Sequence, residues 1–137
     1  MADLVSMSEA TALGLHAAAV LALAEGPTPT AAVASALQAS EAHVSKVLQR
    51  LTRAGVLRSK RGRTGGYSLA RCPSAIRLLD VYQALEGPIR QGRCLFPKPR
   101  CGQGTCILGG LVERIRQDAQ DHLRRTTLAD LVVSARR

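Results

Sequence analysis

The clearest periodic pattern along the chain lies between residues 40 and 55. Its apolar residues recur at the i, i+3, i+4 and i+7 spacing of one helix face: Val44, Val47, Leu48 and Leu51. This spacing predicts an amphipathic helix with one buried side. Ser40 is a typical N-cap just before it, and Gly55 is a typical residue just after the end of a helix. Both boundaries of this helix are therefore predicted as well.

Weaker patterns before this helix predict two more. Residues 6–9 have the form of a capping box, so we expect a helix from there to about residue 25, ending at Gly26-Pro27. A short helix is expected at residues 30–37, followed by a tight turn at residues 38–39. Two short helices joined by a tight turn, the second of them amphipathic, are typical of a helix-turn-helix.

Residues 56–70, with the sequence VLRSKRGRTGGYSLA, are interpreted as a β-hairpin. Residues 56–59 and 67–70 have strand character, and the segment between them is rich in glycine and basic residues. A hairpin directly after a helix-turn-helix predicts a winged helix-turn-helix. The expected fold class is mainly α, with a small β-hairpin wing and a long C-terminal dimerisation helix.

The second half of the chain alternates helical and irregular patterns. A short helix is expected at residues 76–86, a loop at residues 89–105, and a short terminal helix at residues 126–132. From Cys106 the pattern is again helical, with these residues on its apolar face: Leu108, Leu111, Val112, Ile115, Ala119, His122 and Leu123. The opposite face is polar: Glu113, Arg114, Arg116, Gln117 and Asp121. A helix of this kind needs a partner for its apolar face, and a second subunit is the expected one.

The charge balance of the chain favours a polyanionic partner. Lys and Arg number 19 against 10 Asp and Glu, a formal net charge of +9. In a small domain this imbalance suggests nucleic acid, although a solvated basic surface would give the same total. The start of the second helix of a helix-turn-helix faces base edges, which selects Ser40, Glu41, His43, Ser45 and Lys46.

Other candidate DNA contacts lie farther along the helix and in the wing. Gln49 and Arg50 are expected to reach phosphate or sugar. The basic residues of the wing would clamp the DNA backbone or enter the minor groove: Arg58, Lys60, Arg61 and Arg63. The predicted partner is double-stranded promoter DNA, with no membrane and no small-molecule substrate. The sequence contains no phosphate-binding loop and no C-x-x-C motif, so we do not expect an enzyme.

The long loop holds three of the four cysteines, in the spacing C-x6-C-x4-C: Cys94, Cys101 and Cys106. Three thiolates can hold an iron–sulfur cluster when a fourth ligand comes from elsewhere. Zinc would also need a fourth ligand, and the C-x2-C knuckle common in zinc sites is absent. Free redox-active thiols are the third possibility. Cys72, outside the loop, is expected to be a structural thiol.

The fourth ligand has two candidates on the first helix, Glu9 and His16, which could be delivered by a partner subunit. His43 is better explained by DNA, and His122 lies on the expected dimer face. The chain then divides into three predicted segments. Residues 1–88 would form the winged helix-turn-helix DNA-binding domain. Residues 89–106 would form a cysteine-rich cluster-binding loop, and residues 107–137 the dimerisation helix and C-terminal tail.

We expect the protein to lie in the cytoplasm with its thiols reduced. No apolar run reaches the roughly 18 residues that a membrane span needs. The first residues, MADLVSMSEA, lack the basic region with which a signal peptide begins. Both observations favour a cytoplasmic location over a secreted or membrane-bound one.

Taken together, these segments resemble the bacterial winged-helix regulators of the IscR and NsrR type over nearly the whole chain. The resemblance is carried by residues 46–71, residues 78–88, the three-cysteine loop and residues 126–132. It implies a homodimer that binds imperfect palindromes in promoters. It also implies one 2Fe–2S or 4Fe–4S cluster per subunit, held by the three cysteines near the dimer interface. Through this cluster the family responds to nitric oxide, redox change or iron status.

The chain departs from the family pattern at the expected ligands. The usual cysteine spacing is nearer C-x5-C-x5-C, and Gly109 stands where IscR-like members carry a histidine ligand. The acidic ligand of NsrR-like members falls near Ala10, next to Glu9. The recognition-helix glutamate of IscR-like members falls at Ser45, so we expect a different operator sequence. The alternative function is a clusterless regulator of the same fold that senses through its cysteine thiols or a protein partner.

Overall fold

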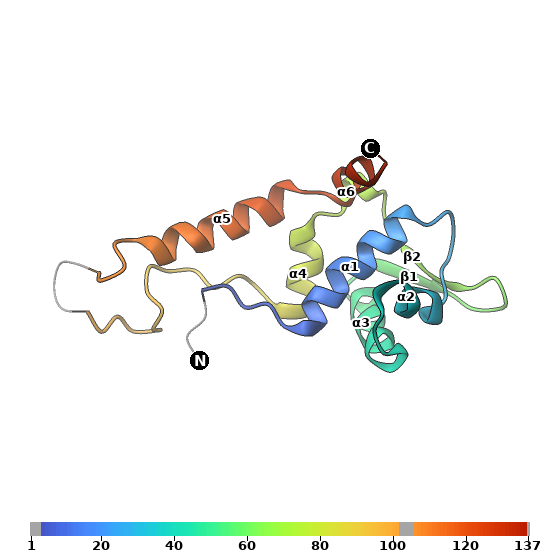
Figure 1. The fold of residues 1–137 in the computed structure, drawn as a ribbon, viewed down its shortest axis with the longest axis horizontal. Helices are drawn as coiled ribbons and strands as arrows, with labels where there is room; N and C mark the ends of the chain where they lie inside the picture. Colours follow the sequence, from blue (N-terminus) through green and yellow to red (C-terminus); the bar gives the residue numbers. More distant parts are fainter. Residues whose placement is uncertain (1–3, 102–105, 137) are drawn as a thin grey trace.

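The computed structural model describes residues 4–101 and 106–136, which form a mainly helical fold with a small antiparallel sheet (Figure 1). The elements, in chain order, are α1 (Glu9–Leu23), α2 (Thr30–Leu37), α3 (Glu41–Arg53), β1 (Leu57–Lys60), β2 (Gly66–Leu69), the short 3-10 helix η1 (Pro73–Ala75), α4 (Leu78–Glu86), α5 (Leu111–Arg125) and α6 (Leu128–Ala135). The predicted fold class, a mainly α winged helix-turn-helix, is confirmed. Among the described helices, none is both long and apolar enough to cross a membrane.

The helix-turn-helix consists of α2 and α3, and both have the predicted bounds. The Ser40 hydroxyl accepts a hydrogen bond from the His43 N–H at 3.1 Å, so Ser40 is the N-cap of α3. Gln38 has φ 52 and makes the tight turn between the two helices. The predicted apolar stripe of α3 is buried: Val44, Val47, Leu48 and Leu51. Local capping and periodicity are therefore sufficient to define this module.

The wing is an antiparallel hairpin in which Leu57 pairs with Leu69 and Lys60 with Gly66. Thr28 extends the sheet, because its N–H donates to the Tyr67 carbonyl at 2.9 Å and the Tyr67 N–H donates back at 2.8 Å. At Gly66, φ is +141, and a Cβ would overlap the backbone of Thr28. The glycine before the wing tyrosine is therefore required by the close approach of these two strands.

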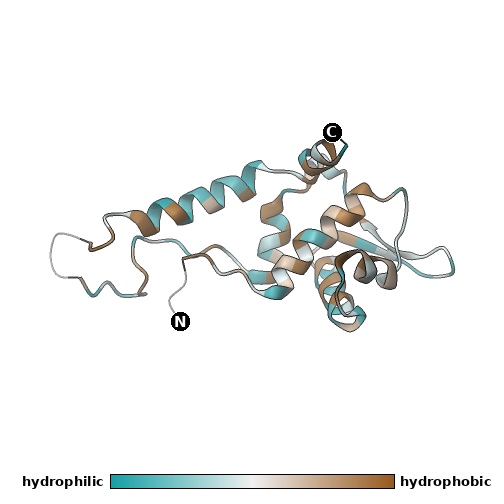
Figure 2. Cartoon of the chain, viewed as in Figure 1, coloured by the Kyte–Doolittle hydropathy of each residue, from teal (hydrophilic) through white to brown (hydrophobic). Residues whose placement is uncertain are grey.

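A single apolar core connects the N-terminal helices, the hairpin and the C-terminal helix. It contains Ala18 of α1, Val33 of α2 and Leu57 of β1, all almost fully buried. Leu128 of α6 is also fully buried in it, so the end of the chain returns to the winged-helix core. Figure 2 shows the contrast with α5, which is hydrophilic over most of its length apart from its N-terminal end.

The prediction for the second half of the chain needs correction at α5. The helix begins at Leu111 instead of Cys106, because Gly109 and Gly110 have positive φ values of 56 and 82. Arg116 was expected on the polar face, but only 2% of it is exposed. It lies one helical turn after the buried Val112 and therefore shares its face. His122, expected on the dimer face, is exposed in the single chain, so its position stays a prediction.

The start of α1 differs from the prediction because its N-cap is Ser8, whose hydroxyl accepts the Thr11 N–H at 3.2 Å. The helix also ends earlier than expected, at Leu23. The Glu86 carboxylate at the end of α4 accepts hydrogen bonds from the Ser8 N–H at 3.2 Å, the Ser8 hydroxyl at 2.9 Å and the Thr11 hydroxyl. These bonds, that of Thr11 above all, hold the pKa of the Glu86 carboxyl below its ordinary value of 4.5.

We predict that Glu86→Gln lowers the free energy of unfolding by about 1 kcal/mol at pH 7, because the variant lacks the hydrogen bonds to the charged carboxylate. Because the pKa of Glu86 is lower in the folded state, the unfolded chain binds more protons as the pH falls. The stabilisation by the Glu86 carboxylate is therefore present above pH 4.5 and disappears as the pH falls through the folded-state pKa. Urea unfolding at several pH values should show the wild type and variant converging in acid. The matched control Glu25→Gln, at an exposed turn, should change the free energy by less than about 0.5 kcal/mol. A constant difference between wild type and variant across all pH values would contradict the prediction.

Candidate functional site

The residues predicted to read bases lie on the N-terminal turns of α3. Glu41 and Lys46 are exposed, whereas His43 and Ser45 are half-buried. The hydroxyl of Ser40 is used as the N-cap, so its side chain already has a hydrogen-bonding partner. Because the opposite face of α3 is buried in the core, this face is the one that α3 can present to a groove. Base contact by these residues stays a prediction.

The two polar residues farther along α3 already have partners within the chain. The Gln49 amide donates to the Ser45 hydroxyl at 3.1 Å. The Arg50 guanidinium donates to the Leu85 carbonyl at 2.6 Å, in the last turn of α4. Arg50 therefore ties the recognition helix to α4. A phosphate contact by Arg50 would have to use its remaining N–H donors.

The wing carries the other predicted DNA contacts, and all four side chains are exposed: Arg58, Lys60, Arg61 and Arg63. The ion pairs found within the described residues involve none of them. Their charges therefore face solvent on a projecting hairpin. Basic side chains in this position can contact phosphates, which supply affinity without reading sequence.

The three loop cysteines line one cavity of about 50 Å³ at the start of α5. Cys94 and Cys106 are half-buried, Cys101 is exposed, and all three are free thiols. The rest of the cavity wall is mostly apolar: Arg93, Leu95, Phe96, Ile107, Leu108 and Val112. Among the described residues, no three His, Cys, Asp or Glu side chains already converge as a metal-binding group. The three predicted ligands thus share a cavity without forming a coordination shell.

Among the described residues, backbone amides point at the sulfur atoms of Cys94 and Cys106. The Phe96 N–H donates to Cys94 Sγ and the Leu108 N–H to Cys106 Sγ, each at 3.4 Å. The Leu108 hydrogen bond is the largest cause that lowers the pKa of the Cys106 thiol, and the Cys101 thiol adds to it. Hydrogen bonds of this kind stabilise thiolates and tune iron–sulfur clusters. The backbone N–H donors around the cysteine sulfurs therefore fit a metal group bound by thiolates.

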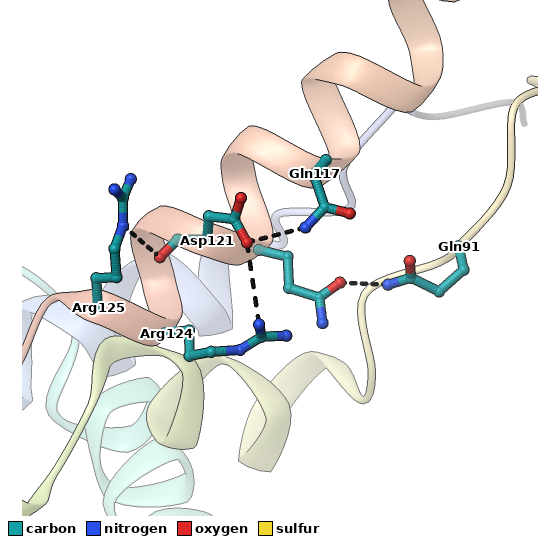
Figure 3. A network of polar contacts seen from close by, with 6 residues as sticks. Gln91, Gln117, Asp121, Arg124 and Arg125 are labelled. Carbon is teal, nitrogen blue, oxygen red and sulfur yellow. Dashed lines mark hydrogen bonds and ion pairs between the residues drawn. The ribbon is translucent and has the colours of Figure 1, made fainter.

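The first part of the loop is attached to α5 by several polar contacts. Gln91 reaches across to α5, where its amide hydrogen-bonds Gln120, close to the pair formed by Gln117 and Asp121 (Figure 3). The exposed Arg93 pairs with Glu113 at 3.0 Å. The sequence pattern did not predict a third and buried contact, from Arg116 to the carbonyl of Cys94 at 2.8 Å. The position of Arg116 one turn after Val112 is the signal that could have revealed it.

The candidate fourth ligands do not line this cavity in their own chain. Glu9 is exposed in the first turn of α1. His16 donates from Nδ1 to the Ala12 carbonyl at 2.7 Å and lines a separate groove between α1 and α6. Delivery of either side chain by a partner subunit stays a prediction. Cys72 does not pack in the core as a structural thiol would, because it is exposed, with Sγ 3.3 Å from the Ser74 hydroxyl.

A helix-turn-helix followed by a basic wing defines a winged-helix transcriptional regulator that binds DNA. Residues 7–134 match the family model described as Rrf2, iron-dependent transcriptional regulator. Since the match covers almost the whole chain, the protein belongs to the Rrf2 family. Membership confirms the resemblance predicted from the wing motif and the three-cysteine loop.

The chain is similar to several members of this family. The HTH-type transcriptional regulator CymR of Bacillus subtilis is 35% identical over 107 residues, which are 78% of this chain and 73% of CymR. The HTH-type transcriptional regulator IscR of Erwinia tasmaniensis is 29% identical over 108 residues, 79% of this chain and 66% of that protein. A solved structure of CymR, described as the global cysteine regulator of Bacillus subtilis, has a TM-score of 0.79 at 32% identity, covering 94% of this chain and 97% of its own. As the sequence predicts, these relatives are regulators and not enzymes.

We predict that replacing Lys60, Arg61 and Arg63 together by Gln weakens binding to a DNA duplex of arbitrary sequence. The slope of log affinity against log salt should become shallower by about 0.9 for each phosphate that the variant no longer neutralises. Fluorescence anisotropy with a labelled duplex over a range of KCl concentrations measures this slope. The control Arg124→Gln with Arg125→Gln removes charge from α5 and should leave the slope unchanged. A wing variant with the wild-type slope would show that the wing does not contact phosphates.

Proposed function

We propose that this protein is a homodimeric transcriptional regulator whose DNA binding responds to an iron–sulfur cluster held by Cys94, Cys101 and Cys106. One observation carries the proposal: three free thiols from both ends of a long loop line a single, mostly apolar cavity. The description of the family as iron-dependent supports it. Each subunit would hold one 2Fe–2S or 4Fe–4S cluster, and the fourth ligand would be Glu9 or His16 of the other subunit.

The residues around the cavity suit such a group. When bound, the cluster would supply a centre that reacts with nitric oxide or changes its redox state. The Phe96 and Leu108 amides would stabilise the charge on two ligand sulfurs. Arg93 lines the cavity, and Arg100 lies over the Phe96 ring at 4.3 Å, so two cations are close to the negative site. The apolar wall would limit access of water.

A path from the cavity to the recognition helix supports coupling to DNA. The cysteine loop follows directly from α4, and Arg50 of α3 is bonded to the last turn of α4 through the Leu85 carbonyl. A change in the position of the loop would therefore act on α3 through α4. The cluster can shift DNA affinity only by the degree to which it prefers one arrangement of the two recognition helices.

Exposed apolar surface supports the proposed homodimer. Ile107 is 88% exposed and Leu111, at the start of α5, is 40% exposed. A second apolar surface, the groove of about 330 Å³ between α1 and α6, is lined by Leu15, His16, Ala19, Leu23, Leu78, Leu131 and Ala135. Two copies related by a two-fold axis would present two α3 helices and bind a palindromic operator.

One observation favours a second candidate function, a clusterless regulator of the same fold that senses through its thiols. Cys101 is exposed, and the pKa of its neighbour Cys106 is lowered, first by the Leu108 amide and further by Cys101 itself. An exposed thiol beside a thiol with a lowered pKa is suited to oxidation. The relative described as the global cysteine regulator has the same fold.

We predict that Cys101→Ala abolishes the visible absorption of the cluster while leaving a folded dimer, because the thiolate that it removes is a ligand. The absorption spectrum after anaerobic reconstitution and the mass in solution by light scattering measure the two properties. Cys72→Ala is the matched control and should keep the full absorption, since Cys72 lies beside η1. Retention of the cluster spectrum in Cys101→Ala would refute the ligand assignment.

A further inference from the structure

We infer that Arg116 is the positioning residue for Cys94. Its side chain holds the start of the cysteine loop, at residues 92–94, and the N-terminal segment, residues 4–8, together on α5. The inference deepens the proposed function and rests on it in so far as Cys94 is a cluster ligand. Arg116 is a charged side chain of which only 2% is exposed. A guanidinium is rarely buried without a structural or functional reason, and its hydrogen-bonding partners show what it holds.

Within the described part of the chain, two of these partners belong to the cysteine loop. Arg116 Nη1 donates to the Cys94 carbonyl at 2.8 Å and to the Gly92 carbonyl at 3.2 Å. The backbone on either side of Arg93 is therefore held by one nitrogen. Gly92 has φ +121, a conformation that side-chain-bearing residues rarely adopt. Arg116 therefore contacts the backbone of Cys94, the first of the three predicted ligands.

A further partner among the described residues is in the N-terminal segment, far from the loop in sequence. Arg116 Nε donates to the Leu4 carbonyl at 3.0 Å. Two residues later the Ser6 carbonyl accepts the Tyr82 hydroxyl of α4 at 2.5 Å. The N-terminal segment is therefore held between α5 and α4 immediately before α1 begins. Arg116 thus joins the predicted ligand loop to the segment that leads into α1.

The other contacts of the loop to α5 are less able to fix Cys94. The ion pair of Arg93 with Glu113 is largely exposed, at 83% and 51%, so solvent screens it. Gln91 attaches to α5 three residues before Cys94. Arg116 alone among these residues is buried and contacts Cys94 directly. The rigid fork of a guanidinium can hold several carbonyls at once, whereas a lysine ammonium acts as a point charge.

The first experiment uses the reduced, metal-free full-length protein and compares Arg116→Gln and Arg116→Lys with the exposed control Arg124→Gln. Alkylation by iodoacetamide, followed residue by residue by mass spectrometry, reports on Cys94, and Cys72 is the internal reference. We expect Cys94 to react about tenfold faster in Arg116→Gln, because the variant lacks a local constraint, with Cys72 unchanged. Arg116→Lys should lie between Arg116→Gln and the wild type.

Three outcomes would overturn the inference. The first is an unchanged alkylation rate of Cys94 in a folded Arg116→Gln variant. The second is an equal rise in the alkylation rates of Cys94 and Cys72, which would indicate general loosening of the fold. The third is an alkylation rate of Cys94 in Arg124→Gln that matches the rate in the Arg116 variants. If Arg116→Gln does not fold, as judged by circular dichroism, Arg116→Lys decides in the same way. Faster tryptic cleavage after Arg93 in the variants should accompany faster alkylation.

A second experiment tests the same role in the reconstituted protein. Arg116→Gln should lose its cluster to a chelator about tenfold faster than the wild type, as expected when a group that orients a ligand is removed, and its visible circular dichroism should change. Identical spectra and loss rates would contradict a positioning role. If neither protein takes up iron and sulfide, the proposed function fails, whereas the alkylation of the metal-free protein still decides the role of Arg116.

Discussion

The burial of one face of α3 is the constraint on which the rest of the molecule depends. Leu48 and Leu51 are fully buried in the core that α1, α2, the hairpin and α6 share. With that face fixed inward, the opposite face and the wing are left exposed, and these are the surfaces predicted to contact DNA. The same packing brings Arg50 to the end of α4, and the cysteine loop begins just beyond it. The recognition surface and the candidate sensor are therefore connected through the contact between α3 and α4.

The candidate sensor lies at the edge of this core and is held by polar contacts. The Glu86 carboxylate joins the end of α4 to the start of α1, and Arg116 joins the cysteine loop, the N-terminal segment and α5. Such contacts are directional, so a shift of the loop can be transmitted without disturbing the apolar core. In the proposed function, the apolar core would support DNA binding and the polar contacts would support sensing, and such a switch would alter DNA affinity by a limited amount.

The extent to which the sequence predicted the structure depends on how local the determining interactions are. Helices α2 and α3 were predicted with their correct bounds, because caps and periodicity within a few residues determine them. The predicted start of α5 was wrong because Gly109 and Gly110 have left-handed backbone conformations, which delay the helix although the apolar pattern begins earlier. The sequence pattern placed Arg116 on the polar face of α5, because its partners, Leu4 and Gly92 among them, are distant in sequence. The three cysteines line one cavity, whereas their role as ligands stays a prediction, and a fourth ligand from another subunit leaves no local pattern.

The proposed regulation depends on whether the three-cysteine cavity binds an iron–sulfur cluster. Native mass spectrometry and a visible absorption spectrum of protein purified without oxygen would decide this question. We expect a brown dimer whose mass includes about two or four iron atoms, with matching sulfide, per subunit. A colourless, metal-free protein after both anaerobic purification and reconstitution would contradict it. The DNA-binding fold would then remain, and the thiols themselves would be the candidate sensor.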